Sequence, residues 1–198
     1  CHIEMVDLGR SSGKQDQYAS AFGGVNSLEI NTEGKVTVTP LKLDPITKKH
    51  LNHNLMFYFS GVTRESNEIL KEQNQDIGGR NQSAVKAMQR IQEIGYESKT
   101  FLESGDLDGF GRSLNEHWEI KKSISNRMSS PFIDEVYQFA MDQGALGGKV
   151  MGAGGGGFFM FYVPAEKHNT FRRSMEKRNL KEMDWQFDHY GVTQVYTT

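Results

Sequence analysis

A run of glycines in the last quarter of the chain has the composition that most strongly suggests chemistry. The run comprises Gly152, Ala153, Gly154, Gly155, Gly156 and Gly157. Because glycine loses more backbone freedom on folding than any other residue, a folded protein keeps such a run where positive φ angles or close backbone approach are needed. Successive backbone N–H groups in such a loop form a concave site that suits a phosphate. The first hypothesis is an enzyme that handles phosphate groups.

Two better-known phosphate loops do not fit this run. Its glycines satisfy the letters G-x-G-x-x-G, but that dinucleotide-binding pattern follows a strand and opens a helix. Here a helical pattern ending near Gly144 comes before the run, and the apolar, strand-like segment 158–163 follows it. No Gly-Lys-Ser/Thr follows either, which excludes a Walker loop. A tight helix-to-strand connection without a ligand stays open as the structural alternative.

A second stretch with catalytic side chains lies near the N-terminus. It reads Gly13, Lys14, Gln15, Asp16 and Gln17. Two serines before it can cap a short helix over 14–22, which places Asp16 in the first helical turn. There the helix dipole and the neighbouring Lys14 hold a carboxylate ionised, and an ionised aspartate can orient a hydroxyl group or take its proton during phosphoryl transfer. On its own, an aspartate in a first turn is more simply explained by its effect on the helix.

Other reactive side chains do not form a recognisable site. His50 and His53 lack a partnering cysteine or acidic cluster, so we expect them on the surface and predict no metal site. Glu116-His117 does not extend to H-E-x-x-H, and no G-x-S-x-G occurs. Cys1, the only cysteine, is a poor candidate for a nucleophile. These patterns disfavour a hydrolase.

Composition narrows the class of protein. The 198 residues carry a formal net charge of −2, which argues against nucleic acid or an anionic membrane as partner. The single cysteine cannot form an internal disulfide, and no apolar run reaches the length of a membrane span, so the cytoplasm is the expected location. The chain begins with Cys1 in what looks like mid-domain sequence. We therefore expect it to be a fragment of a longer protein.

The hydrophobic pattern predicts a mixed α+β fold. Alternation and short apolar runs predict strands at 25–30, 36–43, 55–59, 158–163, 183–187 and 192–197. Helical spacing and capping residues predict helices at 14–22, 64–73, 84–94, 107–118, 131–144 and from Pro164 onward. The polar segment 44–54 is the best candidate for a domain boundary. The order of the later elements is compatible with a split β-α-β layout.

Taken together, the two motifs, their order and their separation resemble the GHMP kinases. The glycine run with its flanking residues, 151–158, looks like that superfamily's C-terminal glycine-rich motif, and 13–17 looks like the segment whose aspartate acts as base. Within the superfamily, 13–19, 58–64 and 118–123 are most similar to the D-glycero-D-manno-heptose 7-phosphate kinases. The resemblance covers essentially the whole chain.

The resemblance implies a fold, an activity and a set of site residues. Residues 1–43 would be the tail of a GHMP N-terminal domain, and 44–198 a ferredoxin-like C-terminal domain with a helical insertion. The implied reaction transfers phosphate from ATP, with Mg²⁺, to a sugar phosphate, and Asp16 is the implied base. The glycine run would shape the phosphate end of the cleft. The substrate-binding residues would be Gly13, Lys14, Gln17 and Arg64.

Arg64 is our candidate for a second anion site, which a sugar that already carries a phosphate requires. It lies near an expected helix start, where exposed N–H groups also favour anions. Pairing of Arg64 with Glu65, Glu68 or solvent explains its presence equally well.

One departure from the GHMP pattern limits what this chain can do alone. The upstream P-x-x-x-G-L-G-S-S type loop that binds ATP phosphates and helps hold Mg²⁺ does not occur in these residues. The implied partners are the sugar phosphate, ATP, the missing N-terminal part of the same protein and, as an open alternative, a second copy in a homo-oligomer. Another sugar kinase, fucokinase-like or galactokinase-like, is the runner-up. A non-catalytic ferredoxin-like module with a structural glycine loop is the alternative from a different class.

Overall fold

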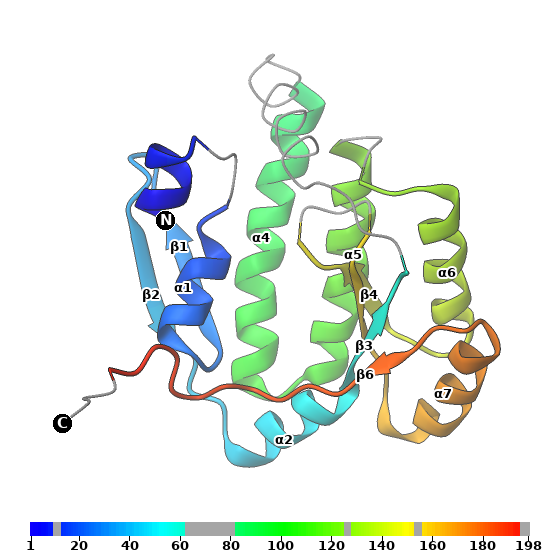
Figure 1. The fold of residues 1–198 in the computed structure, drawn as a ribbon. Helices are drawn as coiled ribbons and strands as arrows, with labels where there is room; N and C mark the ends of the chain where they lie inside the picture. The colour runs from blue at the N-terminus through cyan, green and yellow to red at the C-terminus, as the bar shows by residue number, and fades with distance from the viewer. Residues whose placement is uncertain (10–12, 62–81, 125–127, 153–155, 195–198) are drawn as a thin grey trace. The chain divides into compact units, whose positions relative to one another are not determined.

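The computed structural model describes residues 1–9, 13–61, 82–124, 128–152 and 156–194 (Figure 1). The chain forms two compact units. The first comprises Cys1–Leu43 together with Trp185–Thr198, and the second comprises Asp44–Asp184. The first division falls where the sequence changes to the polar segment 44–54. The C-terminal segment from Trp185 groups with the first unit, which the sequence pattern did not indicate.

The first unit contains a short helix and a hairpin. A π-helical turn, Ile3–Asp7, comes first, followed by helix α1 (Gln15–Phe22) and strands β1 (Asn26–Ile30) and β2 (Val36–Pro40). The strands pair antiparallel, with Ile30 opposite Val36. The expected helix and hairpin are therefore confirmed. None of the side chains whose burial is described in this unit is buried.

The second unit is built on a four-stranded antiparallel sheet. Its strands are β3 (Leu55–Phe59), β4 (Gly147–Val150), β5 (Phe158–Tyr162) and β6 (Glu182–Met183), in the order β4-β5-β3-β6. The first strand in the chain thus lies between the third and the fourth. With a helix before β4 and another before β6, this order is the split β-α-β arrangement. The expected α+β class and ferredoxin-like layout are confirmed.

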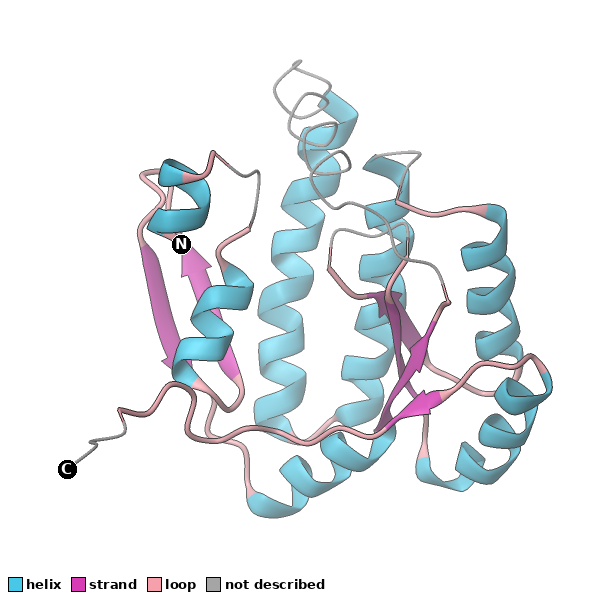
Figure 2. Cartoon of the chain, viewed as in Figure 1, coloured by secondary structure: helices cyan, strands magenta, loops and turns pink. Residues whose placement is uncertain are grey.

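Helices cover both faces of this sheet (Figure 2). In chain order they are α2 (Pro45–Asn54), α4 (Gln82–Ser104), α5 (Leu107–Ile124), α6 (Pro131–Asp142) and α7 (His168–Lys177), with a 3-10 turn at Ala165–Lys167. Figure 1 shows α4 and α5 on one side of the sheet and α6 and α7 on the other. The sheet is therefore the middle layer of this unit.

Two helix starts follow directly from the sequence. Asp44 accepts from the backbone N–H groups of Ile46 and Thr47, and Ser130 accepts from that of Ile133. A proline follows each cap. Proline suits this first helical position, because the N–H that it lacks would have no hydrogen-bond partner within the helix. The Ser130 cap confirms the expected start of α6. The expected boundary segment 44–54 is mostly helix α2.

An aromatic core fills the space between the sheet and helices α6 and α7. Phe161 of β5 is fully buried, and its ring lies 5.9 Å from the rings of both Tyr137 and Phe171. Trp118 of α5 is also fully buried and lies 6.0 Å from Tyr137. These contacts attach the last half of α5 to the core. Phe171 and Met175 of α7 point inward as expected.

Strand β4 was missed by the sequence analysis, and its glycines explain why. Gly147 and Gly148 lower the strand signal, since glycine has no side chain to pack on a sheet. In the structure, a Cβ at Gly147 would overlap the backbone carbonyl oxygen of Gly111 in α5 and lie 2.7 Å from the backbone nitrogen of Asn115. A glycine here lets the helix backbone approach the strand directly.

The expected strands near the C-terminus were wrong in the described part. Of the expected strand at 183–187, only Met183 belongs to a strand, β6 (Glu182–Met183), and the chain passes into the first unit after Asp184. Residues 192–194 form no strand, and 195–198 lie outside the described residues. The expected helix at 64–73 also lies outside them.

The close approach of α5 and β4 generates a stability prediction. We expect Gly147→Ala to lower the free energy of unfolding by about 1–3 kcal/mol, because the added methyl group overlaps backbone rather than a movable side chain. Gly95→Ala, inside α4, is the control. A Cβ there meets nothing within 4 Å, and alanine favours a helix over glycine by up to about 1 kcal/mol. The free energies of unfolding of both variants are measured with urea. A Gly147→Ala variant as stable as the original chain would contradict this explanation.

Candidate functional site

The glycine run connects two antiparallel neighbours, β4 and β5. The Met151 N–H donates to the Phe158 carbonyl at 2.8 Å, and the Gly157 carbonyl accepts from the Ser60 N–H at 2.8 Å. Gly152 and Gly157 have φ angles of 76° and 92°, which a side chain would strain. The loop is thus a strand-to-strand connection, and the expected helix-to-strand connection is wrong because β4 precedes the run. The loop still does not open a helix, so the dinucleotide-binding pattern stays excluded.

The structure describes only part of the glycine run. Gly152 is exposed, and Gly156 is buried. Ala153, Gly154 and Gly155 lie outside the described residues. The phosphate-binding role assigned to these glycines from the sequence therefore stays a prediction.

Two lysines lie beside the beginning of this loop. The Lys121 ammonium, from the last turn of α5, donates to the Gly152 carbonyl at 3.1 Å. Lys149 belongs to β4, two residues after Gly147 and on the same, α5-facing side of the strand. Burial and the positive charge of Lys149 lower the pKa of Lys121 to about 8. A lysine with this pKa is partly deprotonated just above neutral pH.

His117 precedes Lys121 by one helical turn and completes a basic cluster of three side chains. Burial, followed by the charges of Lys149 and Lys121, lowers its pKa to about 3, so its imidazole is neutral at pH 7. Its Nδ1 is buried and has no hydrogen-bond partner among the residues that the structure describes. A buried ring nitrogen without a partner costs about 1–3 kcal/mol.

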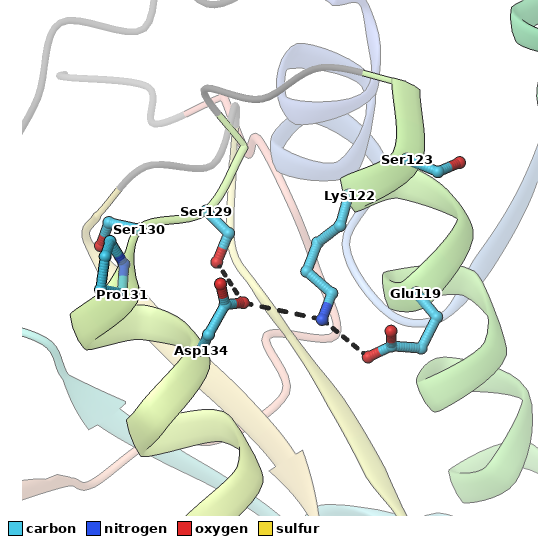
Figure 3. Close-up of a pocket in the computed structure, with 7 residues that line it drawn as sticks. All are labelled: Glu119, Lys122, Ser123, Ser129, Ser130, Pro131 and Asp134. Carbon is cyan, nitrogen blue, oxygen red and sulfur yellow. Dashed lines mark hydrogen bonds and ion pairs between the residues drawn. The ribbon is translucent and has the colours of Figure 1, made fainter.

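A polar cavity of about 500 Å³ opens between the end of α5 and the start of α6 (Figure 3). It is lined by Glu119, Lys122, Ser123, Ser129, Ser130, Pro131 and Asp134. Lys122 reaches Glu119 at 2.8 Å and Asp134 at 3.6 Å, and the Ser129 hydroxyl donates to Asp134 at 2.7 Å. Figure 3 shows these four side chains meeting across the cavity.

The cavity combines hydrogen-bond donors and acceptors without a large excess of charge. Carboxylates accept, the lysine donates, and serine hydroxyl groups do both, which suits a ligand with several hydroxyl groups. The sequence analysis did not find this site. It used 118–123 only for a resemblance and Ser130 only as a helix cap, because no spacing in the sequence shows that the two segments meet.

The N-terminal stretch lies in the first unit. Asp16 is exposed in the first turn of α1, as expected. The Lys14 ammonium donates to the carbonyl oxygen of Gly34, in the turn between β1 and β2, which fixes the start of α1 against the hairpin. Gly13 and Gln17 are half-buried beside it. Arg64 lies outside the described residues, so its place in a site is untested.

The described ranges contain neither a recognisable metal-binding cluster nor a membrane-spanning helix. No group of three or more His, Cys, Asp or Glu side chains there is arranged to hold a metal ion. No helix in the same ranges combines the length and apolar character of a membrane span.

Comparison with known protein families gives a match inside the second unit. Residues 98–181 match the family model for the GHMP kinases C terminal. These residues form a GHMP kinase C-terminal domain. The match runs from the last turns of α4 to the residue before β6, so this GHMP kinase domain includes the basic cluster, the polar cavity and the glycine run.

Relatives resemble the chain over nearly its whole length. It is 34% identical over 191 residues to the D-glycero-alpha-D-manno-heptose 7-phosphate kinase of Campylobacter jejuni subsp. jejuni, covering 96% of this chain and 56% of that protein. The crystal structure of a D-glycero-D-manno-heptose 1-phosphate kinase from Bacteriodes thetaiotaomicron superposes with a TM-score of 0.72 at 32% identity, covering 99% of this chain and 53% of that one. L. major mevalonate kinase shares the fold, with a TM-score of 0.68 at 16% identity and coverage of 82% and 48%. The chain therefore spans about half the length of these relatives.

The lowered pKa of Lys121 predicts how the stability of the GHMP kinase domain depends on pH. Because the folded-state pKa of about 8 lies below the usual 10.5, the unfolded chain binds more protons between these values. The free energy of unfolding should then rise with pH across this window, by about 3 kcal/mol at most from this group. Lys121→Met removes the titration. We expect the difference in unfolding free energy, original chain minus variant, to increase from pH 7.5 to pH 10. Parallel urea-unfolding profiles would contradict the assignment.

Proposed function

We propose that this chain is the C-terminal portion of an ATP-dependent sugar kinase that phosphorylates the anomeric hydroxyl of D-glycero-D-manno-heptose 7-phosphate. The observation that carries the proposal is the 34% identity to a heptose 7-phosphate kinase, which extends over 96% of this chain and so includes both units. The similar crystal structure is named as a heptose 1-phosphate kinase. The two names differ in the position of the phosphate and agree on a heptose that bears one. ATP is a cytoplasmic substrate, which fits the expected location.

The first unit supports the idea that more chain belongs to the enzyme. Its large exposed apolar side chains are Ile3, Val6, Leu8, Phe22, Ile30, Tyr190 and Val192. With no buried side chain described, such a small set of elements lacks a core of its own. We infer that residues 1–43 are the tail of a GHMP N-terminal domain, that 44–198 are the C-terminal domain, and that the missing N-terminal part covers these apolar side chains.

The same N-terminal part is proposed to hold ATP and Mg²⁺. The described residues offer no cluster of side chains that fits a metal, so the residues that would hold Mg²⁺ are proposed to lie in that missing part. Asp16 is proposed as the base. As the anomeric oxygen bonds to the γ-phosphorus of ATP and ADP leaves, the proton of that hydroxyl passes to the Asp16 carboxylate. Exposure of Asp16 at a helix start leaves it accessible to a substrate.

The remaining predicted site residues are proposed to position the substrates. Gly13, Lys14 and Gln17 flank the base, and Arg64 would bind the phosphate already on the sugar. The glycine run from Gly152 to Gly157 would form the phosphate end of the cleft, where its positive φ angles free the backbone to approach a ligand.

A second sugar kinase activity is supported by weaker similarity. The chain is 24% identical over 184 residues to the bifunctional fucokinase/GDP-fucose pyrophosphorylase of Arabidopsis thaliana, and 28% identical over 97 residues to the galactokinase of Pyrococcus furiosus. The test is a substrate panel for the full-length enzyme with ATP and Mg²⁺. It contains heptose 7-phosphate, heptose 1-phosphate, fucose and galactose, and ³¹P NMR identifies the product. Faster turnover of fucose or galactose would move the assignment to the runner-up, and no turnover of any sugar would favour the non-catalytic module.

The chain alone should not transfer phosphate, because it lacks the loop proposed to hold ATP. We expect no ADP release above background when the purified 198 residues are mixed with ATP, Mg²⁺ and heptose 7-phosphate. The full-length enzyme under the same conditions is the control. Turnover by the chain comparable to that control would disprove the division of labour between the two parts.

Asp16→Asn should remove most of the activity of the full-length enzyme. A positioned general base contributes about 10²–10⁴ in rate, whereas the amide keeps the size of the side chain, so kcat should fall by that factor with KM within a few-fold. Glu33→Gln, which neutralises an exposed carboxylate in the turn between β1 and β2, is the matched control. A near-normal kcat for Asp16→Asn would contradict the proposed role of Asp16 as base. Asp16 would then be explained by its effect on the start of the helix.

A further inference from the structure

A row of contacting side chains crosses the polar cavity between α5 and α6 (Figure 3). The Lys122 ammonium lies 2.8 Å from Glu119 and 3.6 Å from Asp134. The Ser129 hydroxyl donates to the same Asp134 oxygen at 2.7 Å. The ammonium also lies 5.7 Å from the centre of the Tyr137 ring, within the range of a cation–π contact. These contacts hold the lysine in place before a ligand arrives.

The carboxylates of this row stay accessible to a ligand. The side chains of Glu119 and Asp134 are 53% and 52% exposed, whereas that of Lys122 is 24% exposed. The cavity of about 500 Å³ lies within the range of about 300–1,000 Å³ that is usual for small-molecule sites. The row thus presents two charged acceptors and one charged donor to a space that can hold a small molecule.

The charges of the row disfavour an ion as the ligand. A phosphate group in the cavity would lie against both carboxylates, and like charges at close range repel each other. A cation would have to displace the Lys122 ammonium, which already contacts Glu119 and Asp134. An ion of either sign therefore meets a like charge. A neutral ligand that both donates and accepts hydrogen bonds meets no such repulsion.

We propose that Glu119, Lys122 and Asp134 form a subsite for adjacent hydroxyl groups of the acceptor sugar. The proposal rests on the proposed kinase function and names the residues that hold the sugar ring. A sugar hydroxyl group can accept from the Lys122 ammonium while it donates to one of the carboxylates. An ammonium has three N–H groups, so Lys122 can bond a sugar oxygen and keep its contact with Glu119. The phosphate on the sugar then lies outside the cavity.

One of the three serines that line the cavity is suited to the same ligand. The Ser129 hydroxyl donates to Asp134, so its oxygen can still accept from a sugar hydroxyl group. The Ser130 oxygen serves as the cap of α6, and the Ser123 hydroxyl donates to the carbonyl oxygen of Ile120 at 2.7 Å. We therefore assign Ser129 to the subsite as a further acceptor.

A purely structural role for the row leads to a different expectation. Exposed ion pairs stabilise a fold little. If the row only joined α6 to α5, its variants would shift the thermal unfolding slightly and leave sugar binding unaltered. Binding and KM for the sugar therefore separate the two roles.

Sugar binding to the chain is the first test, and it requires no turnover. Backbone amides labelled with ¹⁵N are followed by NMR while mannose, sodium phosphate or magnesium chloride is added at constant ionic strength. Mannose is the probe because the proposed heptose has the same manno ring. We expect mannose to shift the amide signals of Lys122 and Ser129 and the two salts to leave them in place. No shift with mannose, or a larger shift with either salt, would overturn the subsite.

Single substitutions measure the contribution of each charge. Lys122→Met and Asp134→Asn keep most of the side-chain volume and should weaken mannose binding about 10- to 100-fold, the value of one hydrogen bond to a charged group. Lys177→Met, in the last turn of α7, and Asp184→Asn, just after β6, change exposed residues and are the matched controls. Circular dichroism and thermal unfolding establish that each variant is folded. Folded Lys122→Met and Asp134→Asn variants that bind mannose like the controls would also overturn the subsite.

Steady-state kinetics of the full-length enzyme show whether the bound sugar is the acceptor. We expect Lys122→Met and Asp134→Asn to raise KM for heptose 7-phosphate about 10- to 100-fold and to leave KM for ATP unchanged. Active variants with an unchanged KM for heptose 7-phosphate would remove the subsite and leave the kinase function intact. If the enzyme phosphorylates another sugar instead and the same substitutions raise KM for that sugar, the subsite is supported and the proposed substrate is wrong.

Discussion

Direct contact between the backbones of α5 and β4 is the constraint on which the site in the second unit depends. Gly147 has no side chain to hold the helix away, and the carbonyl oxygen of Gly111 occupies the space that a Cβ would take. Gly111 in turn lies against the ring of Tyr162 in β5, where a Cβ would come within 2.9 Å of a ring carbon. The last half of α5 is thereby fixed beside the end of β4. Lys121 can reach the glycine loop only because of this approach.

A buried hydroxyl group strengthens the same junction from the other face of the sheet. The Tyr137 hydroxyl, from α6, donates to Asn115 of α5 at 2.9 Å and lies 3.3 Å from the carbonyl oxygen of Gly148 in β4. Burial raises the pKa of this tyrosine, so its hydroxyl stays protonated as the donor. The junction thus joins α5, α6 and β4, the elements that border the polar cavity and the basic cluster.

Local patterns in the sequence predicted the elements that local forces determine. The α6 cap at Ser130, the hairpin of β1 and β2 and the apolar strand β3 all depend on neighbouring residues, and each was expected. Strand β4 depends on a tertiary contact, because its two glycines have poor strand propensity until α5 packs against them. The alternation at 183–187 was also misleading, because the aromatic side chains of this segment pack on each other and not on a sheet. The rings of Trp185 and Phe187 pack on each other at 4.9 Å in the first unit and belong to no strand.

The parts of the candidate site that could be predicted from the sequence are those whose residues lie within one short segment. The glycine run and Asp16 stand out by composition and position within a few residues, although their roles remain predictions. The basic cluster draws on α5 and β4, and the cavity on α5 and α6, so neither has a signature within one stretch. A weak signal existed in the helical spacing of His117 and Lys121. This spacing indicates a basic cluster only once the structure shows that Lys149 lies beside the two residues.

The two successive lysines at the end of α5 have different surroundings. Lys122 lines the polar cavity, where the carboxylates of Glu119 and Asp134 balance the charge of its ammonium. The Lys121 ammonium instead donates to the Gly152 carbonyl at 3.1 Å, and burial together with the charge of Lys149 lowers its pKa. The two lysines therefore differ in their electrostatic surroundings because one faces α6 and the other faces the end of β4.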